Sequence, residues 1–149
     1  MNNLTTFAVD KNLMKKTAEN ILAGEKAKKK DISIVLLSPA KMKSLNWKYR
    51  HKNRTTDVLT FPDLDIVICP QVVKDNARKE DLPFKQELVK VVIHGVLHFL
   101  GYEHEGTAEE ARKMRGKEEK YLKDIGFNFK FQSSNVKSNP KLKCQKFGF

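Results

Sequence analysis

Apolar and polar residues alternate along this chain with two periodicities, one typical of helices and one typical of strands. Apolar residues at helical spacing predict five helices, most of them bounded by residues that start or end helices. The segments are Asp10 to Gly24, Ser38 to Tyr49, Pro70 to Arg78, Pro83 to Gly101 and Thr107 to Ile125. The helix that Pro83 opens has a wide apolar face, which predicts that this helix is buried.

Short runs rich in Ile, Val and other strand-forming residues separate these helices. They predict strands at Leu4 to Val9, Asp31 to Leu37, Val58 to Phe61 and Asp65 to Cys69. The strand that ends at Leu37 and the helix after it form a βα unit, because Ser38 and Pro39 supply a cap and a first-turn proline. Only a short turn that begins at Pro62 separates the last two strands, which predicts a hairpin.

The length and composition describe one compact globular domain with a basic extension. The chain has 149 residues, of which 40% are hydrophobic and 32% are charged, as in ordinary globular proteins. No acidic residue follows Asp124, and the remaining residues are rich in Lys, Asn and Ser. We expect a folded domain over residues 1–126 and a basic, partly disordered C-terminal extension over residues 127–149.

Three features argue against a membrane-spanning, secreted or disulfide-rich protein. The apolar run Val89 to Leu100 is interrupted by a lysine and two histidines, and it is shorter than the ~20 residues that a bilayer requires. The first residues lack the basic start, apolar middle and cleavage site of a secretory signal. The two cysteines, Cys69 and Cys144, build neither a disulfide framework nor a cysteine metal cluster. We therefore expect a cytoplasmic protein with no membrane partner.

The net charge favours a polyanionic partner. The chain has 29 Lys and Arg residues against 18 Asp and Glu residues, which gives a net charge of +11. Such a charge attracts nucleic acid through the release of counterions, so nucleic acid is the first candidate partner. A lysine-rich surface that only keeps the protein soluble has the same composition, and charge alone leaves both interpretations open.

Three of the four histidines lie within one stretch of eleven residues. His94 and His98 are four residues apart, so on a helix both imidazoles lie on one face and can bind one ion. Gly101 permits the positive φ that ends a helix, and the chain can then turn back to bring in His104. Three histidines leave one coordination position open for water, which is the pattern of catalytic and not of structural zinc sites. We predict one metal ion per chain, bound by His94, His98 and His104.

Two alternatives to this metal site fit the residues less well. Core histidines, each paired with a backbone carbonyl, would explain one such residue but not three at ligand spacing. The spacing also resembles that of metzincin proteases, but Gly95 stands where those enzymes carry the glutamate that serves as general base. Glu103 is the nearest carboxylate, and it is better placed to orient His104. Zinc is preferred over nickel or copper because histidines bind all three and availability decides between them.

Three segments of the chain resemble one known family. The segment His94-Gly95-x-Leu97-His98-x-Leu100-Gly101-Tyr102-x-His104 resembles the signature of the YbeY family of endoribonucleases. Upstream, Leu45-Asn46 with Tyr49-Arg50 and the run Thr56 to Pro62 resemble a second block of that family, and Asp65 to Ile68 resembles its next strand. The similarity covers residues 31–125 in the order that the family shows.

The resemblance implies an α+β fold: a single domain with a small mixed β-sheet, packed helices and a metal site at the end of a long central helix. Residues 1–126 would then be a metal-dependent hydrolase domain. His94, His98 and His104 match the family's zinc ligands, and Arg50 matches the arginine that meets the RNA phosphate. These four are the expected catalytic residues, with one Zn²⁺ per chain as the cofactor.

The activity that the resemblance implies is that of a zinc-dependent, single-strand-specific endoribonuclease. Its expected roles are 16S rRNA 3′-end maturation, rRNA processing and ribosome quality control. The expected partners are ribosomal RNA and the small ribosomal subunit, with no DNA. The residues alone leave two other classes open: a metallohydrolase acting on peptides or small molecules, and a noncatalytic RNA-binding assembly factor. The oligomeric state does not follow from the sequence.

Two positions depart from the family pattern. The family commonly has Asp where this chain has Glu103, and Gly where it has Leu64. Neither residue is a predicted ligand. The longer side chain of Glu103 changes the surroundings of a ligand, and Leu64 indicates a different turn between the two strands.

Residues near Arg50 each allow a structural and a functional interpretation. Without the resemblance, the sequence would predict that Arg50 is a solvated residue of a basic loop. Asp57 is expected to cap a turn, and His51 to be a loop histidine outside the metal spacing. Trp47 and Tyr49 can stack on a base, although aromatic residues at helical spacing more often belong to the core.

Overall fold

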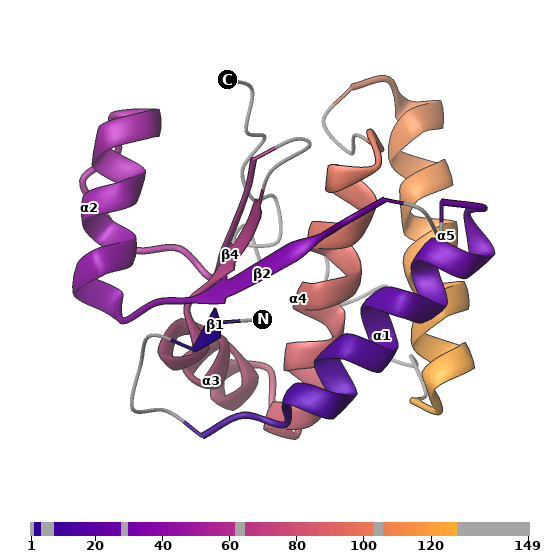
Figure 1. Cartoon of the computed structure of the whole chain (residues 1–149), viewed down its shortest axis with the longest axis horizontal. Coiled ribbons are helices and arrows are strands. Elements are labelled where there is room, and N and C mark those ends of the chain that lie inside the picture. Colours follow the sequence, from indigo (N-terminus) through magenta and orange to yellow (C-terminus); the bar gives the residue numbers. More distant parts are fainter. Residues whose placement is uncertain (1, 4–7, 28–29, 62–64, 103–105, 128–149) are drawn as a thin grey trace.

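The computed structural model describes residues 2–3, 8–27, 30–61, 65–102 and 106–127, which form five helices and four strands. The helices are α1 (Lys11–Gly24), α2 (Pro39–Arg50), α3 (Pro70–Lys79), α4 (Phe84–Phe99) and α5 (Ala108–Ile125). The strands are β1 (Asn2–Asn3), β2 (Ser33–Leu36), β3 (Val58–Thr60) and β4 (Asp65–Ile68). The fold is therefore α+β, as the resemblance implies (Figure 1).

The four strands form one small mixed sheet in the order β1-β2-β4-β3. β2 pairs in parallel with β1 and with β4, so that Ile34 of β2 lies opposite Ile66 of β4. β3 pairs antiparallel with β4, and Leu59 lies opposite Val67, which confirms the predicted hairpin. The parallel pairing of β2 and β4 requires a crossover, which runs through α2 and β3.

Side chains that the sequence marks as caps begin three of the helices. Asp10 before α1, Ser38 before α2 and Thr107 before α5 each accept a hydrogen bond from the amide three residues on, at 3.0, 3.4 and 3.1 Å. Gly101 and Gly126 follow α4 and α5 with φ of +102° and +106°, a backbone region that favours glycine. These local signals explain why the helix boundaries agree with the prediction.

The start of the sheet includes residues that the sequence does not predict as a strand. The structure describes strand pairing of Asn2–Asn3 with β2, just before the predicted run Leu4 to Val9. The described part of that run, Ala8 and Val9, leads into α1 and is not in a strand. Strand propensity reflects a fit to a half-buried pleated surface, so the neighbouring strand decides which residues pair. Residues 4–7 and the extension at 128–149, for which partial disorder is predicted, lie outside the described residues.

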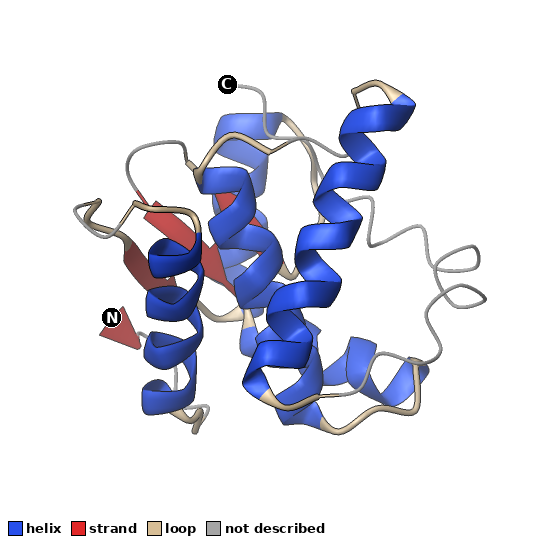
Figure 2. Ribbon diagram, turned by 90° about the vertical axis from the view of Figure 1, so that its right-hand side faces the viewer, coloured by secondary structure: helices blue, strands red, loops and turns tan. Residues whose placement is uncertain are grey.

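Two apolar clusters lie on the two faces of the sheet, because side chains alternate along a strand. Ile34, Ile66 and Ile68 belong to the cluster that also contains buried residues of α1, α4 and α5. Val67 points to the other face, where Met42 of α2 packs. Figure 1 shows α2 set apart from the other helices, and Figure 2 shows the helices of the larger cluster in front of the strands.

α4 is the central helix and lies directly on the sheet. Gly95 permits this approach, since a Cβ at that position would lie 2.9 Å from Cγ2 of Ile66. The hydroxyl of Thr60 in β3 donates a hydrogen bond to the carbonyl of Gly95 at 3.5 Å. Every residue of α4 from Gln86 to Phe99 except Lys90 is buried, as the wide apolar face predicts. No helix in the described ranges is long and apolar enough to cross a membrane.

Candidate metal centre

His94 and His98 lie on successive turns of α4, near its C-terminal end. Both residues are buried, with exposed fractions of 8% and 9%. Their Nε2 atoms are 3.1 Å apart, and their rings meet at 75° with centroids 4.5 Å apart. The same nitrogen of each imidazole therefore lies close to that of the other on one face of α4, as the spacing of four residues predicts.

Glu118 of α5 orients His94 from the other side of the ring. Its Oε2 lies 2.7 Å from Nδ1 of His94 and accepts the hydrogen bond. This partner places the proton of a neutral imidazole on Nδ1, so that the lone pair is on Nε2, which faces His98. A carboxylate behind a histidine fixes the ring and raises its basicity, which is a common arrangement at metal sites.

Sequence reasoning missed Glu118, which follows His94 by 24 residues. A weak signal was present, because Glu118 stands four residues after buried Met114 and four before buried Leu122, on the inward side of α5. Helical spacing alone does not say what that side meets. The predicted third ligand His104 lies outside the described residues, as does Glu103, which was expected to orient it.

The chemistry and spacing of the two imidazoles fit a zinc ion. Two nitrogens bound to one tetrahedral zinc at about 2.0–2.1 Å lie roughly 3.3 Å apart. The two Nε2 atoms are 3.1 Å apart, a separation that also suits a hydrogen bond between the imidazoles when no ion is bound. Among the residues with described positions, no group of three ligand-type side chains occurs. His104 as the third ligand therefore stays a prediction.

Asp57 is a buried carboxyl group that lies within the electrostatic reach of His94. It is 4% exposed, and this burial raises its pKa, while the attraction of His94 acts in the opposite direction. Its backbone carbonyl accepts a hydrogen bond from the amide of Cys69 at 2.9 Å. The hydroxyl of Thr56 donates to Oδ1 at 3.4 Å. These contacts join the start of β3 to the end of β4 beside the histidine pair.

Arg50 is the last residue of α2 and is half-buried. Because α2 and α4 pack on opposite faces of the sheet, Arg50 and the histidines come from different layers of the fold. Buried Asn46 shapes the connection after α2, since its Nδ2 donates to the carbonyl of Arg54 at 2.8 Å. His51 is exposed and ends α2 with φ of +57°, which agrees with its interpretation as a loop histidine.

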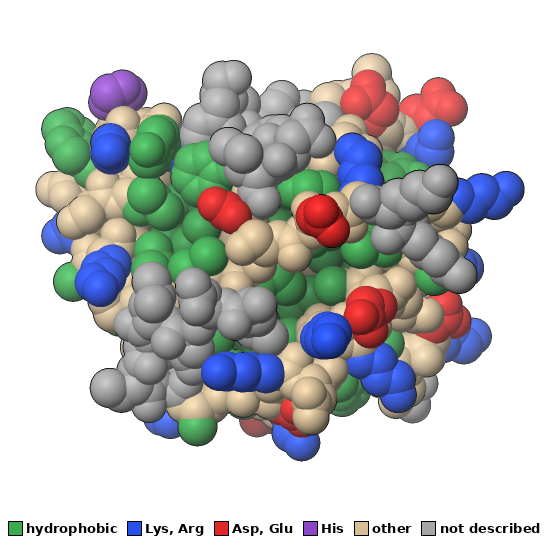
Figure 3. Space-filling model, in the orientation of Figure 1, with side chains coloured by type: hydrophobic (Ala, Val, Ile, Leu, Met, Phe, Trp, Pro, Cys, Tyr) green, Lys and Arg blue, Asp and Glu red, His purple; other side chains and the backbone are tan. Residues whose placement is uncertain are grey.

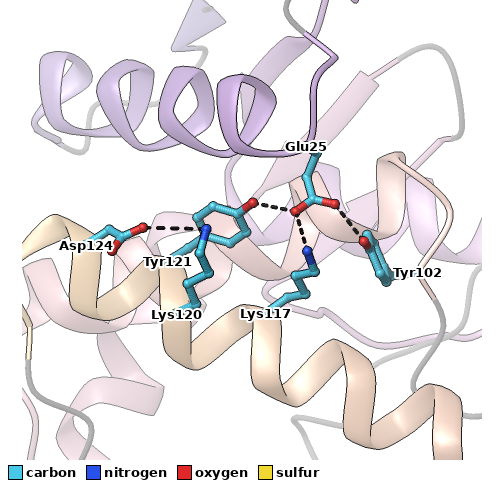
Figure 4. A network of polar contacts seen from close by, with 6 residues as sticks. All are labelled: Glu25, Tyr102, Lys117, Lys120, Tyr121 and Asp124. Carbon is cyan, nitrogen blue, oxygen red and sulfur yellow. Dashed lines mark hydrogen bonds and ion pairs between the residues drawn. The ribbon is translucent and has the colours of Figure 1, made fainter.

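A group of residues around Glu25, which we call the Glu25 hub, joins the end of α1 to α5 and to the chain after α4. Glu25 accepts hydrogen bonds from the hydroxyl of Tyr102 at 2.6 Å, from Nζ of Lys117 at 3.0 Å and from the hydroxyl of Tyr121 (Figure 4). Burial raises the pKa of Glu25, but these donors and the charge of Lys117 outweigh burial and lower the pKa to about 2. The hub therefore fixes Tyr102, which precedes His104 by two residues.

A family model described as Endoribonuclease YbeY matches residues 1–126. The chain belongs to this family. The match includes Arg50, the histidine pair of α4 and the segment that carries His104. The resemblance seen in the sequence is thereby confirmed, and so is the small mixed sheet with packed helices that it implies.

Relatives and a solved structure agree with the family. Endoribonuclease YbeY of Thermotoga maritima is 39% identical over 100 residues, which cover 63% of this chain and 67% of the relative. The protein of that name from Thermodesulfovibrio yellowstonii is 43% identical over 105 residues, covering 63% and 66%. The one from Thermosipho melanesiensis is 37% identical over 123 residues, covering 76% and 89%. The matched region thus spans about two thirds of the length of the first two relatives and more of the third.

The fold also resembles a structure solved in solution. TM1509 from Thermotoga maritima superposes with a TM-score of 0.62 and 31% sequence identity, and the match covers 100% of both chains. The sequence match and the solved structure therefore agree on both the family and the fold of this chain.

Proposed function

We propose that this protein is a zinc-dependent endoribonuclease that cuts single-stranded RNA. The observation that carries the proposal is the buried pair His94 and His98, with Nε2 atoms 3.1 Å apart and Glu118 behind His94. The relatives described above bear the name Endoribonuclease YbeY. A net charge of +11 suits a polyanionic substrate.

The residues of the chain have separate tasks in this proposal. His94, His98 and His104 hold one zinc ion, and Glu118 keeps the imidazole of His94 in the tautomer that can bind it. When bound, zinc supplies a Lewis acid for a phosphodiester oxygen and acidifies a water molecule. Arg50 donates to the phosphate with its planar fork and stabilises the negative charge that develops there. Burial of the histidine pair strengthens these electrostatic interactions by excluding bulk water.

The proposed substrate is ribosomal RNA. We infer roles in 16S rRNA 3′-end maturation, rRNA processing and ribosome quality control, with the small ribosomal subunit as partner and the cytoplasm as location. Membership of the YbeY family and the positive charge of the chain support this inference. Unpaired segments are the expected targets, because their bases and backbone are accessible to a protein site.

The packing of α4 argues against the peptidase alternative. A peptidase of the metzincin type needs a glutamate beside its first histidine ligand. That position is Gly95, and a Cβ there would already lie 2.9 Å from Ile66 Cγ2. A glutamate cannot be added without moving α4 away from the sheet. The backbone at this position therefore serves packing and offers no general base.

The first experiment measures zinc content and RNA cleavage together. Wild-type protein, His98→Ala and Arg50→Ala are compared, with His51→Ala as the matched control because His51 is an exposed histidine outside the predicted site. The substrates are an unpaired oligoribonucleotide and fragments of ribosomal RNA. We expect about one zinc ion per wild-type chain and loss of both zinc and cleavage in His98→Ala. Arg50→Ala should keep zinc and cleave about 100-fold more slowly, while His51→Ala behaves as wild type.

Chelation distinguishes catalysis from simple RNA binding. EDTA should abolish cleavage, and added zinc should restore it. If the zinc-loaded wild type binds RNA without cutting it, and His98→Ala binds equally well, the protein is a noncatalytic assembly factor and the proposal fails. Cleavage by His98→Ala at the wild-type rate would also contradict it.

A further inference from the structure

α2 exposes two large aromatic side chains that the core does not use. Trp47 is 56% exposed and Tyr49 is 45% exposed. The buried residues of this helix are Met42 and Asn46, so neither ring belongs to the sheet-facing core. The structure thus rules out the more common interpretation of aromatic residues at helical spacing. Large apolar side chains that are exposed on one short stretch of helix are typical of binding surfaces.

All the charged residues around this helix are positively charged. Residues 38–56 contain six Lys and Arg residues and no Asp or Glu. Lys43 and Lys48 are exposed on the same helix as the two rings. Figure 3 shows hydrophobic and basic side chains gathered over α2, at the upper left of the molecule. We call this group the α2 surface; it consists of Lys43, Trp47, Lys48, Tyr49 and His51.

Contacts with neighbouring rings hold both aromatic side chains in defined orientations. Trp47 meets His51 edge to face at 89°, with centroids 6.0 Å apart. Tyr49 meets Phe61 at 81°, with centroids 5.3 Å apart. Nζ of Lys48 lies 5.2 Å from the centroid of Tyr49. Rings that are already ordered lose less entropy when a ligand binds them.

We propose that the α2 surface binds unpaired RNA, with bases stacked on Trp47 and Tyr49 and the intervening backbone phosphate at Lys48. Residues two apart lie on nearly opposite sides of a helix, so the two rings flank Lys48 around the last turns of α2. Aromatic rings with cations between them match the bases and phosphates of a single strand. This inference rests on the proposed endoribonuclease function and places part of the substrate beside Arg50, the next residue after Tyr49.

Trp47 is the sole tryptophan of the chain, so its fluorescence reports on this surface alone. The full chain is titrated with a decameric oligoadenylate in EDTA, so that metal-dependent cleavage does not consume the probe. We expect saturable quenching, because a base stacks directly on the indole ring. Duplex RNA of the same length should quench little, since its bases are already paired and stacked.

Variants with matched controls test the two parts of the surface. Tyr49→Ala should weaken binding about tenfold, and Tyr49→Phe should restore it, since the ring and not the hydroxyl stacks. The double variant Lys43→Ala/Lys48→Ala should bind RNA more weakly. The slope of log K against log salt concentration should become less steep by about 0.7 for each phosphate contact that is lost. Lys15→Ala/Lys16→Ala removes the same charge from exposed positions of α1 and should change both quantities little.

The outcomes separate this inference from the proposed function. Absence of quenching, equal quenching by duplex RNA, or equal loss of affinity in both lysine pairs would overturn the α2 surface as a stacking site. If the zinc-loaded wild type still cuts RNA in that case, the endoribonuclease function stands without it. Saturable quenching and a specific effect of Tyr49→Ala, in a protein that never cuts RNA, would support the surface and refute the activity.

Discussion

Replacing Glu25 by Gln removes the negative charge to which three donors of the Glu25 hub are bound. The side chain is 10% exposed, and its surroundings lower its pKa from 4.5 to about 2. A carboxyl group whose folded pKa lies below its unfolded pKa stabilises the fold above the unfolded value, and this stabilisation is lost as the pH falls through the folded value. At about 1.36 kcal/mol for each pKa unit, the group contributes at most about 3 kcal/mol at neutral pH.

The assay is urea unfolding followed by circular dichroism at a series of pH values. Between about pH 6 and about pH 3 the wild type should lose about 2 kcal/mol of unfolding free energy through this one group. Glu25→Gln does not titrate there, so its deficit relative to the wild type should shrink by that amount. Glu19→Gln is the matched control, because Glu19 is exposed on α1, the helix that Glu25 follows, and the charge change is identical. It should alter stability by less than about 0.5 kcal/mol.

Two results would refute this reasoning about Glu25. A gap between wild type and Glu25→Gln that stays constant over the same pH range would show that the carboxylate charge is not what the hub stabilises. A deficit equal to that of Glu19→Gln would show that the buried hydrogen bonds contribute no more than an exposed acidic side chain.

Three further predictions concern packing, the metal site and a helix cap. Gly95→Ala should lower the free energy of unfolding by about 1–3 kcal/mol because α4 lies on the sheet there, whereas Gly116→Ala, in open space within α5, should raise it by about 0.5–1 kcal/mol. Equal effects in urea unfolding would contradict this. Glu118→Gln should weaken zinc binding about 10–100-fold, measured in competition with a chelating dye. Glu119→Gln, a change at an exposed residue of the same helix, should leave the zinc affinity unchanged. Unchanged affinity in both variants would show that Glu118 has no role at the zinc site. Thr107→Ala should cost about 1 kcal/mol in the same unfolding assay through loss of its cap, and no loss would count against that cap.

Most of the fold follows from local signals in the sequence. The five helices occur where apolar spacing and capping residues predict them, and the hairpin of β3 and β4 follows from two strand-forming runs separated by a short turn. The pairing of Asn2–Asn3 with β2 was not predicted, because the partner strand and not local propensity selects these residues. Of the predicted first strand, Leu4 to Val9, Ala8 and Val9 are not in a strand, and residues 4–7 lie outside the described residues.

The candidate site also has some features that the sequence determines and others that only the tertiary structure determines. The sequence by itself determined the histidine pair, because a spacing of four residues on one helix brings two imidazoles together whatever surrounds them. Only the tertiary structure decided that Glu118 forms a hydrogen bond with His94 and that Trp47 is exposed. It also decided that Glu25 accepts hydrogen bonds from residues of α5 and from Tyr102. These features depend on how segments far apart in the chain pack against one another, and no spacing within a single helix or strand encodes that packing.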